Sequence, residues 1–186
     1  MTVEDLLEVV AGRGDGPALV SGDRVWSYSD VATAVSARAA RLRSEAGNSG
    51  PIVPVTLHAD PSGVVKLLAL WAAGRVVAPL NPLLTRVESE RAHGSLAGVT
   101  PPPGAAAVLW TSGTSGRPRG VALSMDNLAA VTESSAQRLS LSGDDVWLAS
   151  LSLAHVGGLV LVVRSLLLGG VVVLPQAQDT PTLSNL

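Results

Sequence analysis

Residues 110–121 read Trp-Thr-Ser-Gly-Thr-Ser-Gly-Arg-Pro-Arg-Gly-Val and are the most informative stretch of this 186-residue chain. They follow an apolar run, Ala105 to Trp110, that predicts a buried strand. The glycines let backbone N–H groups approach a ligand closely, and the hydroxyl groups are further donors. The arginines supply forked cationic groups that suit phosphate. This composition allows either a polyphosphate-binding loop or an ordinary exposed turn, because Ser, Thr and Gly fill both.

The order of the residues excludes two common phosphate-binding loops. A Walker A loop needs Gly-x-x-x-x-Gly-Lys-Ser/Thr, and the chain contains no Gly-Lys pair. A dinucleotide fingerprint needs Gly-x-Gly-x-x-Gly between a strand and a helix, and no such segment is present here. A different phosphate-binding pattern is therefore needed.

The order resembles the signature loop of the adenylate-forming superfamily, which includes acyl- and aryl-CoA synthetases, luciferases and peptide-synthetase adenylation domains. The match runs from Thr111 through Val121, with Arg119 where the family usually has lysine. Arginine keeps the charge of lysine but not its compact ammonium group. The resemblance implies that this loop binds the β- and γ-phosphates of ATP, through Thr111, Ser112, Gly113, Thr114, Ser115, Gly116 and Arg119.

Three further stretches resemble the family's pattern in the expected order: residues 26–30, 74–82 and 145–159. In the last of these, His155 matches a family histidine beside the carboxylate-substrate pocket, so the resemblance makes it the candidate catalytic residue. Taken alone, a histidine beside apolar residues is more often a core residue. Ser152 and Ala154 replace the family's proline and aromatic residue, which leaves the shape of the acyl pocket open.

Residues 155–167 resemble in particular the o-succinylbenzoate-CoA ligases of menaquinone synthesis. The substrate of those enzymes is a dicarboxylate, and Arg164 is a candidate partner for its anionic end. The alternative, which we favour, is that Arg164 has a structural role at a helix edge. His58 and His93 match no motif, and we expect them on the surface or in loops.

The resemblance implies a two-step reaction. A carboxylate attacks the α-phosphorus of Mg²⁺-bound ATP to give an acyl-adenylate and pyrophosphate, and the thiolate of CoA then displaces AMP. The family's members are much longer, and their adenine-binding motif, ribose-binding aspartate and C-terminal subdomain with its catalytic lysine have no counterpart here. We therefore expect ATP, Mg²⁺ and CoA as ligands of a complete enzyme, and little or no ligase activity from this chain alone.

Three interpretations stay open. The chain is the N-terminal part of an acyl-CoA ligase, or a non-catalytic remnant that binds a partner chain or an acyl ligand. As a third alternative, it belongs to an enzyme that transfers the activated carboxylate to a carrier protein. An incomplete sheet would leave an unpaired edge and exposed apolar faces, so we expect a complementing chain or a homo-oligomer.

Composition narrows the class of protein. Apolar residues are 47% of the chain and charged residues 15%, which predicts a sizeable core. A net charge of -2 with scattered arginines does not indicate a nucleic-acid surface. The absence of cysteine excludes disulfides and thiolate metal sites, and we predict no metal-binding residues.

Two segments indicate the cellular location that we expect for the protein. The acidic N-terminus lacks the basic start and apolar run of a secretory signal, so we expect a cytoplasmic protein. Residues 156–175 are almost long enough to span a bilayer. However, Arg164 near the middle and the Gly169-Gly170 pair favour a buried helix followed by a buried strand.

The remaining pattern predicts an α/β fold, a layered and parallel-rich sheet with flanking helices. The strand and helix alternation before residue 80 indicates parallel strands joined by right-handed crossovers. We divide the chain into an N-terminal βαβαβ segment, 1–100, and a phosphate-loop and acyl-pocket segment, 101–186. The expected strands are 25–28, 52–57, 75–79, 105–110, 121–124, 145–150 and 171–174. The expected helices are 31–42, 61–73, 125–139 and 156–168, and Ser29 or Asp30 is the expected N-cap of the first. Residues 85–104 are expected to be a surface loop or a subdomain boundary.

Overall fold

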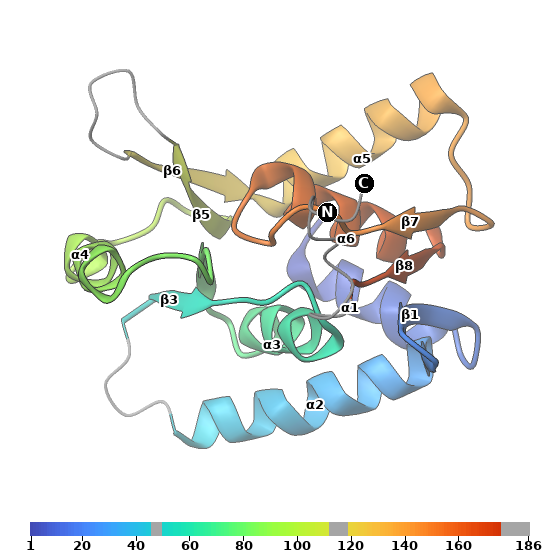
Figure 1. Ribbon diagram of the computed structural model, residues 1–186, viewed down its shortest axis with the longest axis horizontal. Coiled ribbons are helices and arrows are strands. Elements are labelled where there is room, and N and C mark those ends of the chain that lie inside the picture. The colour runs from blue at the N-terminus through green and yellow to red at the C-terminus, as the bar shows by residue number, and fades with distance from the viewer. Residues whose placement is uncertain (46–49, 112–118, 176–186) are drawn as a thin grey trace, which may run out of the picture.

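The computed structural model describes residues 1–45, 50–111 and 119–175. Two four-stranded sheets lie on either side of a layer of helices (Figure 1). We call them sheet A, in the order β2-β1-β8-β7, and sheet B, in the order β3-β4-β5-β6. The expected α/β class with parallel-rich sheets and flanking helices is confirmed.

Sheet A combines the start and the end of the described chain. β1 (Pro17–Ser21) pairs antiparallel with β2 (Arg24–Ser27) and parallel with β8 (Val171–Val173). β7 (Val146–Leu148) pairs parallel with β8 and forms the edge.

Sheet B is built from a continuous middle part of the chain. β3 (Ile52–Thr56), β4 (Val76–Leu80) and β5 (Ala105–Thr111) are parallel, and β6 (Arg119–Ser124) is antiparallel to β5. The predicted parallel crossover is present in this sheet, where α3 (Pro61–Ala72) connects β3 to β4.

One predicted strand belongs to a different sheet from the one we expected. Residues 24–27 pair antiparallel with β1, which the sequence analysis missed, and not parallel with β3. The reason is local: Gly22 takes a φ of 57° and closes a tight hairpin between β1 and β2. Each sheet contains strands from both sides of residue 100. The division of the chain into segments 1–100 and 101–186 stays a prediction.

Two predictions about helices were wrong: the start of one, and the absence of another. α2 (Tyr28–Ser44) begins before Ser29 and Asp30, because Ser27 is the N-cap and forms a capping box with Asp30. The predicted loop at 85–104 contains α4 (Arg86–Leu96), which starts with a capping box between Thr85 and Glu88. The charged composition of this segment hid a Thr-x-x-Glu start signal.

The predicted helices α5 (Met125–Leu139) and α6 (Val156–Leu168) have the expected bounds. α6 ends at Gly169, which has a φ of 91°, and β8 follows, as predicted for residues 156–175. None of the helices in the part of the chain that the structure describes is long and apolar enough to cross a membrane.

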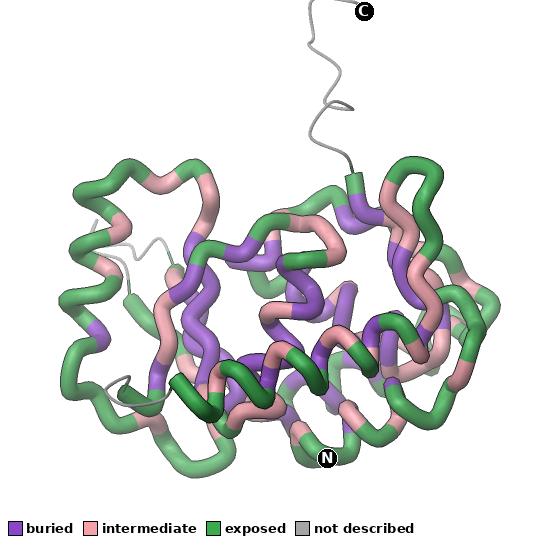
Figure 2. Tube along the Cα trace, turned by 90° about the horizontal axis from the view of Figure 1, so that it is seen from below, coloured by how far each residue is buried: buried purple, intermediate pink, exposed green. Residues whose placement is uncertain are grey.

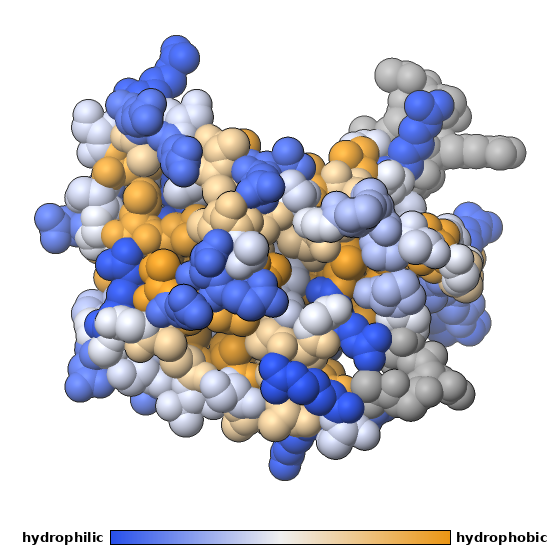
Figure 3. Space-filling model, turned by 180° about the vertical axis from the view of Figure 1, so that it is seen from behind, coloured by the Kyte–Doolittle hydropathy of each residue, from blue (hydrophilic) through white to orange (hydrophobic). Residues whose placement is uncertain are grey.

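The core lies between the two sheets. α3 is buried along most of its length and α6 along one side, and their residues form one cluster with the inner faces of both sheets. Figure 2 shows these buried segments inside a surface of exposed helix turns and loops. Apolar side chains also reach the surface in patches, as Figure 3 shows for the rear of the molecule.

Two buried hydrogen bonds attach helices to the sheets. The indole N–H of Trp71 on α3 donates to the carbonyl of Ala106 on β5, at 2.8 Å. The hydroxyl of Tyr28 donates to the carbonyl of Gly170, also at 2.8 Å. Burial raises the pKa of Tyr28 to about 12, so this donor keeps its proton at neutral pH.

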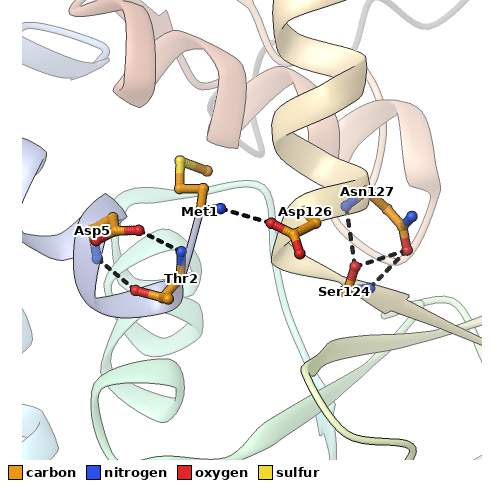
Figure 4. Close-up of polar contacts among 6 residues, drawn as sticks. All are labelled: Met1, Thr2, Asp5, Ser124, Asp126 and Asn127. Atoms are coloured by element: carbon orange, nitrogen blue, oxygen red, sulfur yellow. Dashed lines mark hydrogen bonds and ion pairs between the residues drawn. The ribbon is translucent and has the colours of Figure 1, made fainter.

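The N-terminus is attached to α5. α1 (Val3–Gly12) starts with a capping box between Thr2 and Asp5, and α5 starts with one between Ser124 and Asn127. The amino group of Met1 lies 2.6 Å from a carboxylate oxygen of Asp126 and joins the two helix starts (Figure 4). Its hydrogen bond to Asp126 raises the pKa of this amino group.

Candidate functional site

A cavity of about 570 Å³ lies at the carboxyl ends of β4 and β5. In open α/β sheets this is where ligands usually bind. Its wall combines the β4–α4 segment, the end of β5 and the segment before α6: Pro79, Asn81, Leu84, Glu88, Arg91, Ala92, Ser95, Trp110, Thr111, Ala154 and His155. This cavity is our candidate active site because it brings together two of the predicted site residues, Thr111 and His155.

His155 is held at the cavity by the start of α6. It is the N-cap residue, its N–H donates to the carbonyl of Ser152 at 3.0 Å, and its carbonyl accepts from Leu159 at 3.0 Å. Its side chain makes no capping hydrogen bond, so the imidazole is available to a ligand in the cavity.

Gly158 allows this local arrangement. A Cβ at this position would lie 2.3 Å from the carbonyl oxygen of Ser152 and 2.7 Å from that of Leu151. Only glycine lets α6 approach the preceding segment so closely. The glycine at position 158 is therefore explained by packing.

Thr111 and Arg119 lie opposite each other at the ends of β5 and β6. The hydroxyl of Thr111 donates to the carbonyl of Arg119 at 3.3 Å, so this pair fixes both ends of the connecting segment. Arg119 is not among the cavity-lining residues in the described part of the chain. The other predicted phosphate-binding residues, Ser112, Gly113, Thr114, Ser115 and Gly116, lie outside the described residues.

α4 adds residues that the sequence analysis did not predict for the site. Glu88, Arg91, Ala92 and Ser95 have the i, i+3, i+4, i+7 spacing of one helix face, and all four line the cavity. Recognition of the Thr-x-x-Glu capping box would have predicted the helix and this spacing, but not its position next to the site.

The carboxylate of Glu88 is already engaged by α4. It accepts hydrogen bonds from the hydroxyl and the N–H of Thr85, at 2.7 and 2.8 Å. The side-chain and backbone bonds from Thr85, and then the charge of Arg91, lower the pKa of Glu88. Arg91 and His155 also line this cavity. Their side chains can donate hydrogen bonds to an anionic ligand. The indole N–H of Trp110 is buried and has no partner among the described residues.

Arg164 has a structural position, in agreement with the interpretation we favoured. Its guanidinium lies 4.1 Å from the centroid of the Trp147 ring, a cation–π contact between α6 and β7. Burial lowers the pKa of Arg164, and the nearby charge of Asp145 opposes this effect. Arg164 does not line the cavity described above.

The two unassigned histidines are exposed, as expected. His58 follows β3, and His93 lies on α4 with its Nδ1 2.8 Å from the carbonyl of Ser89. A second cavity, of about 590 Å³, lies beside sheet A and is lined by Arg13, Tyr28 and Gly169 among others. It contains none of the predicted site residues, and Arg13 there donates to the carbonyl of Leu167 at 2.7 Å.

The chain belongs to the AMP-binding enzyme family, whose profile matches residues 6–93 and 87–186. This membership confirms the predicted resemblance to the adenylate-forming superfamily.

Among curated proteins, the chain is similar to 2-succinylbenzoate–CoA ligases. It is 28% identical to that of Bacillus pumilus (strain SAFR-032) over 200 residues, which cover 87% of this chain and 41% of the relative. It is 40% identical to that of Bacillus cytotoxicus over 72 residues, 39% of this chain and 15% of the relative. The chain thus spans about two fifths of the length of the B. pumilus relative.

Solved structures show the same fold. O-succinylbenzoate coenzyme A synthetase (MenE) from Bacillus subtilis, in complex with AMP, superposes with a TM-score of 0.78 at 22% identity, over 92% of this chain and 55% of MenE. The N-terminal subdomain of Klebsiella oxytoca NpsA, in complex with 3-hydroxyanthranilyl-AMSN, gives a TM-score of 0.82 at 22% identity, over 99% of this chain and 55% of that one.

Proposed function

We propose that this chain is the phosphate- and carboxylate-binding part of an acid–CoA ligase. The complete enzyme would use ATP to convert a carboxylate to an acyl-adenylate and then to an acyl-CoA. The observation that carries this proposal is the single cavity that contains Thr111 and His155, where β5 leads into residues 112–118.

The residues of the chain divide between the two substrates. In the proposal, residues 111–116 and Arg119 hold the β- and γ-phosphates of ATP and later the leaving pyrophosphate. His155 and Arg91, which both line the cavity, orient the carboxylate. Catalysis of adenylation then rests on positioning and on neutralising charge at the phosphate oxygens.

The bond changes follow from these roles. A carboxylate oxygen attacks the α-phosphorus as the bond to pyrophosphate breaks, and the thiolate of CoA then attacks the acyl carbon and releases AMP. The Mg²⁺ ion would accompany ATP. The contacts for adenine, ribose and CoA would come from the parts of the relatives that this chain does not cover, in a cytoplasmic enzyme.

The first carboxylate to test is 2-succinylbenzoate, because the similar curated proteins carry that name. It has two carboxylates, and the cavity wall has two basic side chains, Arg91 and His155. One carboxylate would react, and the other would pair with the basic group left free.

Calorimetric titration of the chain with Mg²⁺-ATP and with 2-succinylbenzoate tests the proposal. Loss of a charged hydrogen bond costs about 1.5–3 kcal/mol, so we expect Arg119→Ala to weaken ATP binding at least about tenfold, and Arg91→Ala to do the same for the carboxylate. Thr114→Ala should weaken ATP binding less. Arg138→Ala, on the exposed end of α5, is the matched control and should change neither affinity.

Two outcomes would contradict the proposal. If Arg119→Ala binds ATP as well as the unchanged chain, the phosphate assignment is wrong. If the chain binds the carboxylate but no nucleotide, the interpretation as a non-catalytic binding remnant is correct.

Assays of ATP conversion and of acyl transfer test which thiol accepts the acyl group and whether the chain needs a further polypeptide. We expect negligible conversion of ATP to AMP by the chain alone, and conversion after addition of a polypeptide that carries the adenine and lysine motifs. Acyl transfer to CoA supports the ligase, whereas transfer only to carrier-protein pantetheine would establish the alternative acceptor.

A further inference from the structure

A groove of about 490 Å³ lies between α2 and α3, which run side by side (Figure 1). None of its lining residues belongs to the candidate active site. Part of the lining is apolar and comes from both helices: Ala34, Ala37, Leu42 and Val65. The groove can therefore contact the apolar part of a ligand.

Two arginines and a lysine lie at this groove. Arg38 and Arg41 are three residues apart on one face of α2, and both line the groove. Lys66 follows Val65 on α3 and is close enough to Arg38 for the two charges to repel each other. Burial, and then this repulsion, lower the pKa of Lys66.

These cations have no counter-ion in the described chain. The side chains of Arg38, Arg41 and Lys66 form no ion pair or hydrogen bond with any residue that the structure describes. Glu45 also lines the groove, but it forms no ion pair with either arginine. Arg38 and Lys66 are half-buried. Partial burial of a charge without a counter-ion is unfavourable, so a bound anion would stabilise this part of the molecule.

We propose that the groove between α2 and α3 binds a small organic phosphate. Guanidinium groups match the oxygen geometry of phosphate. Three positive charges and the one negative charge of Glu45 leave a net charge of about +2, which balances a phosphate monoester at neutral pH. A monocarboxylate would leave part of this charge uncompensated. The inference does not depend on the proposed ligase reaction, because the groove and the candidate active site share no residue.

The test uses Lys66 as a probe, because it is the only lysine of the chain. Lysine labelled with carbon-13 at Cε gives a single NMR signal, which is followed during titration with phenyl phosphate at constant ionic strength. We expect a saturable shift of this signal and a rise in the pKa of Lys66, because a bound anion favours the charged form. Inorganic phosphate, which lacks the apolar part, should bind severalfold more weakly, and so should benzoate, which has a single charge.

Arg38→Gln and Arg138→Gln form a matched pair of variants. Each removes one positive charge from a helix surface, but Arg138 lies on α5, outside the groove. We expect Arg38→Gln to weaken binding of phenyl phosphate about fivefold or more, because charged hydrogen bonds are lost, and Arg138→Gln to weaken it less than twofold. Circular dichroism verifies folding, and Arg41→Gln replaces Arg38→Gln if the latter unfolds. Arg119→Ala, in the proposed ATP site, should leave the Lys66 titration unchanged, so the two proposals are tested separately.

Four results would overturn the proposal. The first is a Lys66 signal that does not respond to phenyl phosphate. The second is an equal response to chloride or benzoate, because the groove would then only screen charge. The third is equally tight binding of inorganic phosphate, because the apolar lining would then contribute nothing. The fourth is equal weakening by Arg38→Gln and Arg138→Gln.

Discussion

The two sheets differ in how much of their apolar surface is exposed to solvent, although their strands are similarly apolar. On the outer face of sheet B, Leu96 of α4 packs with Ile52, Val76, Ala78 and Val108. Leu96 is 9% exposed, whereas Leu148 on the outer face of sheet A is 60% exposed. Figure 1 shows α4 and sheet A at opposite ends of the molecule.

This difference shows what a covering helix contributes. α4 shields sheet B from water and, on its next face, supplies Arg91 and Glu88 to the cavity. On sheet A, by contrast, the edge strand β7 exposes Val146 and Leu148, which are 65% and 60% accessible to solvent. The proposed ligand site thus lies beside the covered sheet.

The largest expected loss of stability comes from a substitution in α3, in the helix layer between the two sheets. In Gly63→Ala on α3, the new Cβ would lie 2.0 Å from the carbonyl oxygen of His58, so backbone must move. We expect a loss of about 3 kcal/mol or more in the free energy of unfolding, measured by urea denaturation. Gly94→Ala, in open space on α4, is the control and should stabilise the protein by about 0.5–1 kcal/mol. Equal effects of the two would refute this packing argument.

The next prediction compares the two outer faces directly. Leu96→Ala removes buried apolar volume beneath α4 and should cost about 2–3 kcal/mol. Leu148→Ala makes the same chemical change on an exposed position and should stay within about 0.5 kcal/mol. Thermal or urea unfolding of both variants provides the measurement. A large loss for Leu148→Ala would mean that the outer face of sheet A is already covered.

A smaller effect is expected within sheet A. Tyr28→Phe keeps the ring but removes the hydroxyl that donates to the carbonyl of Gly170, before β8. We expect a loss of about 1 kcal/mol, because the buried carbonyl loses its partner. Amide exchange at residues 171–173 should become faster while that of sheet B is unchanged. An unchanged unfolding free energy would show that water replaces the lost bond.

The smallest effect concerns pH and α4. The bonds from Thr85 lower the pKa of Glu88 below its ordinary value of 4.5, so the unfolded chain binds this proton more tightly than the folded one. The contribution is therefore fully present above pH 4.5 and is lost as pH falls through the lower, folded pKa. Glu88→Gln should therefore flatten the fall in unfolding free energy between pH 5 and about 3. Identical profiles would exclude this linkage.

Much of the fold was predictable from local sequence. The bounds of α5 and α6 follow from helical spacing and from Ser124 and Gly169 as end signals. α4 was not predicted, because its charged residues outweighed a short capping signal. The partition into two sheets was not predicted either, because the pairing of β1 with β8 depends on distant residues.

The candidate site was only half predictable. Thr111 and His155 were found through a family resemblance, and the structure places both in one cavity. Arg91 and Trp110 could not be assigned without knowing that α4 packs beside the end of β5. Their place at the cavity comes from tertiary packing, which no local pattern of residues encodes.

The pairing of Leu19 with Val172 has a consequence for synthesis on the ribosome. Sheet B consists of residues 52–124 and can form while translation continues. In contrast, β1 can pair with β8 only after about 150 more residues have been synthesised. At about 5–20 residues per second, that delay is roughly 8–30 s. During this interval the β1–β2 hairpin has no sheet to join, so we expect nascent chains that stop before residue 171 to recruit chaperones. Ribosome-bound chains arrested on either side of β8 would reveal the difference.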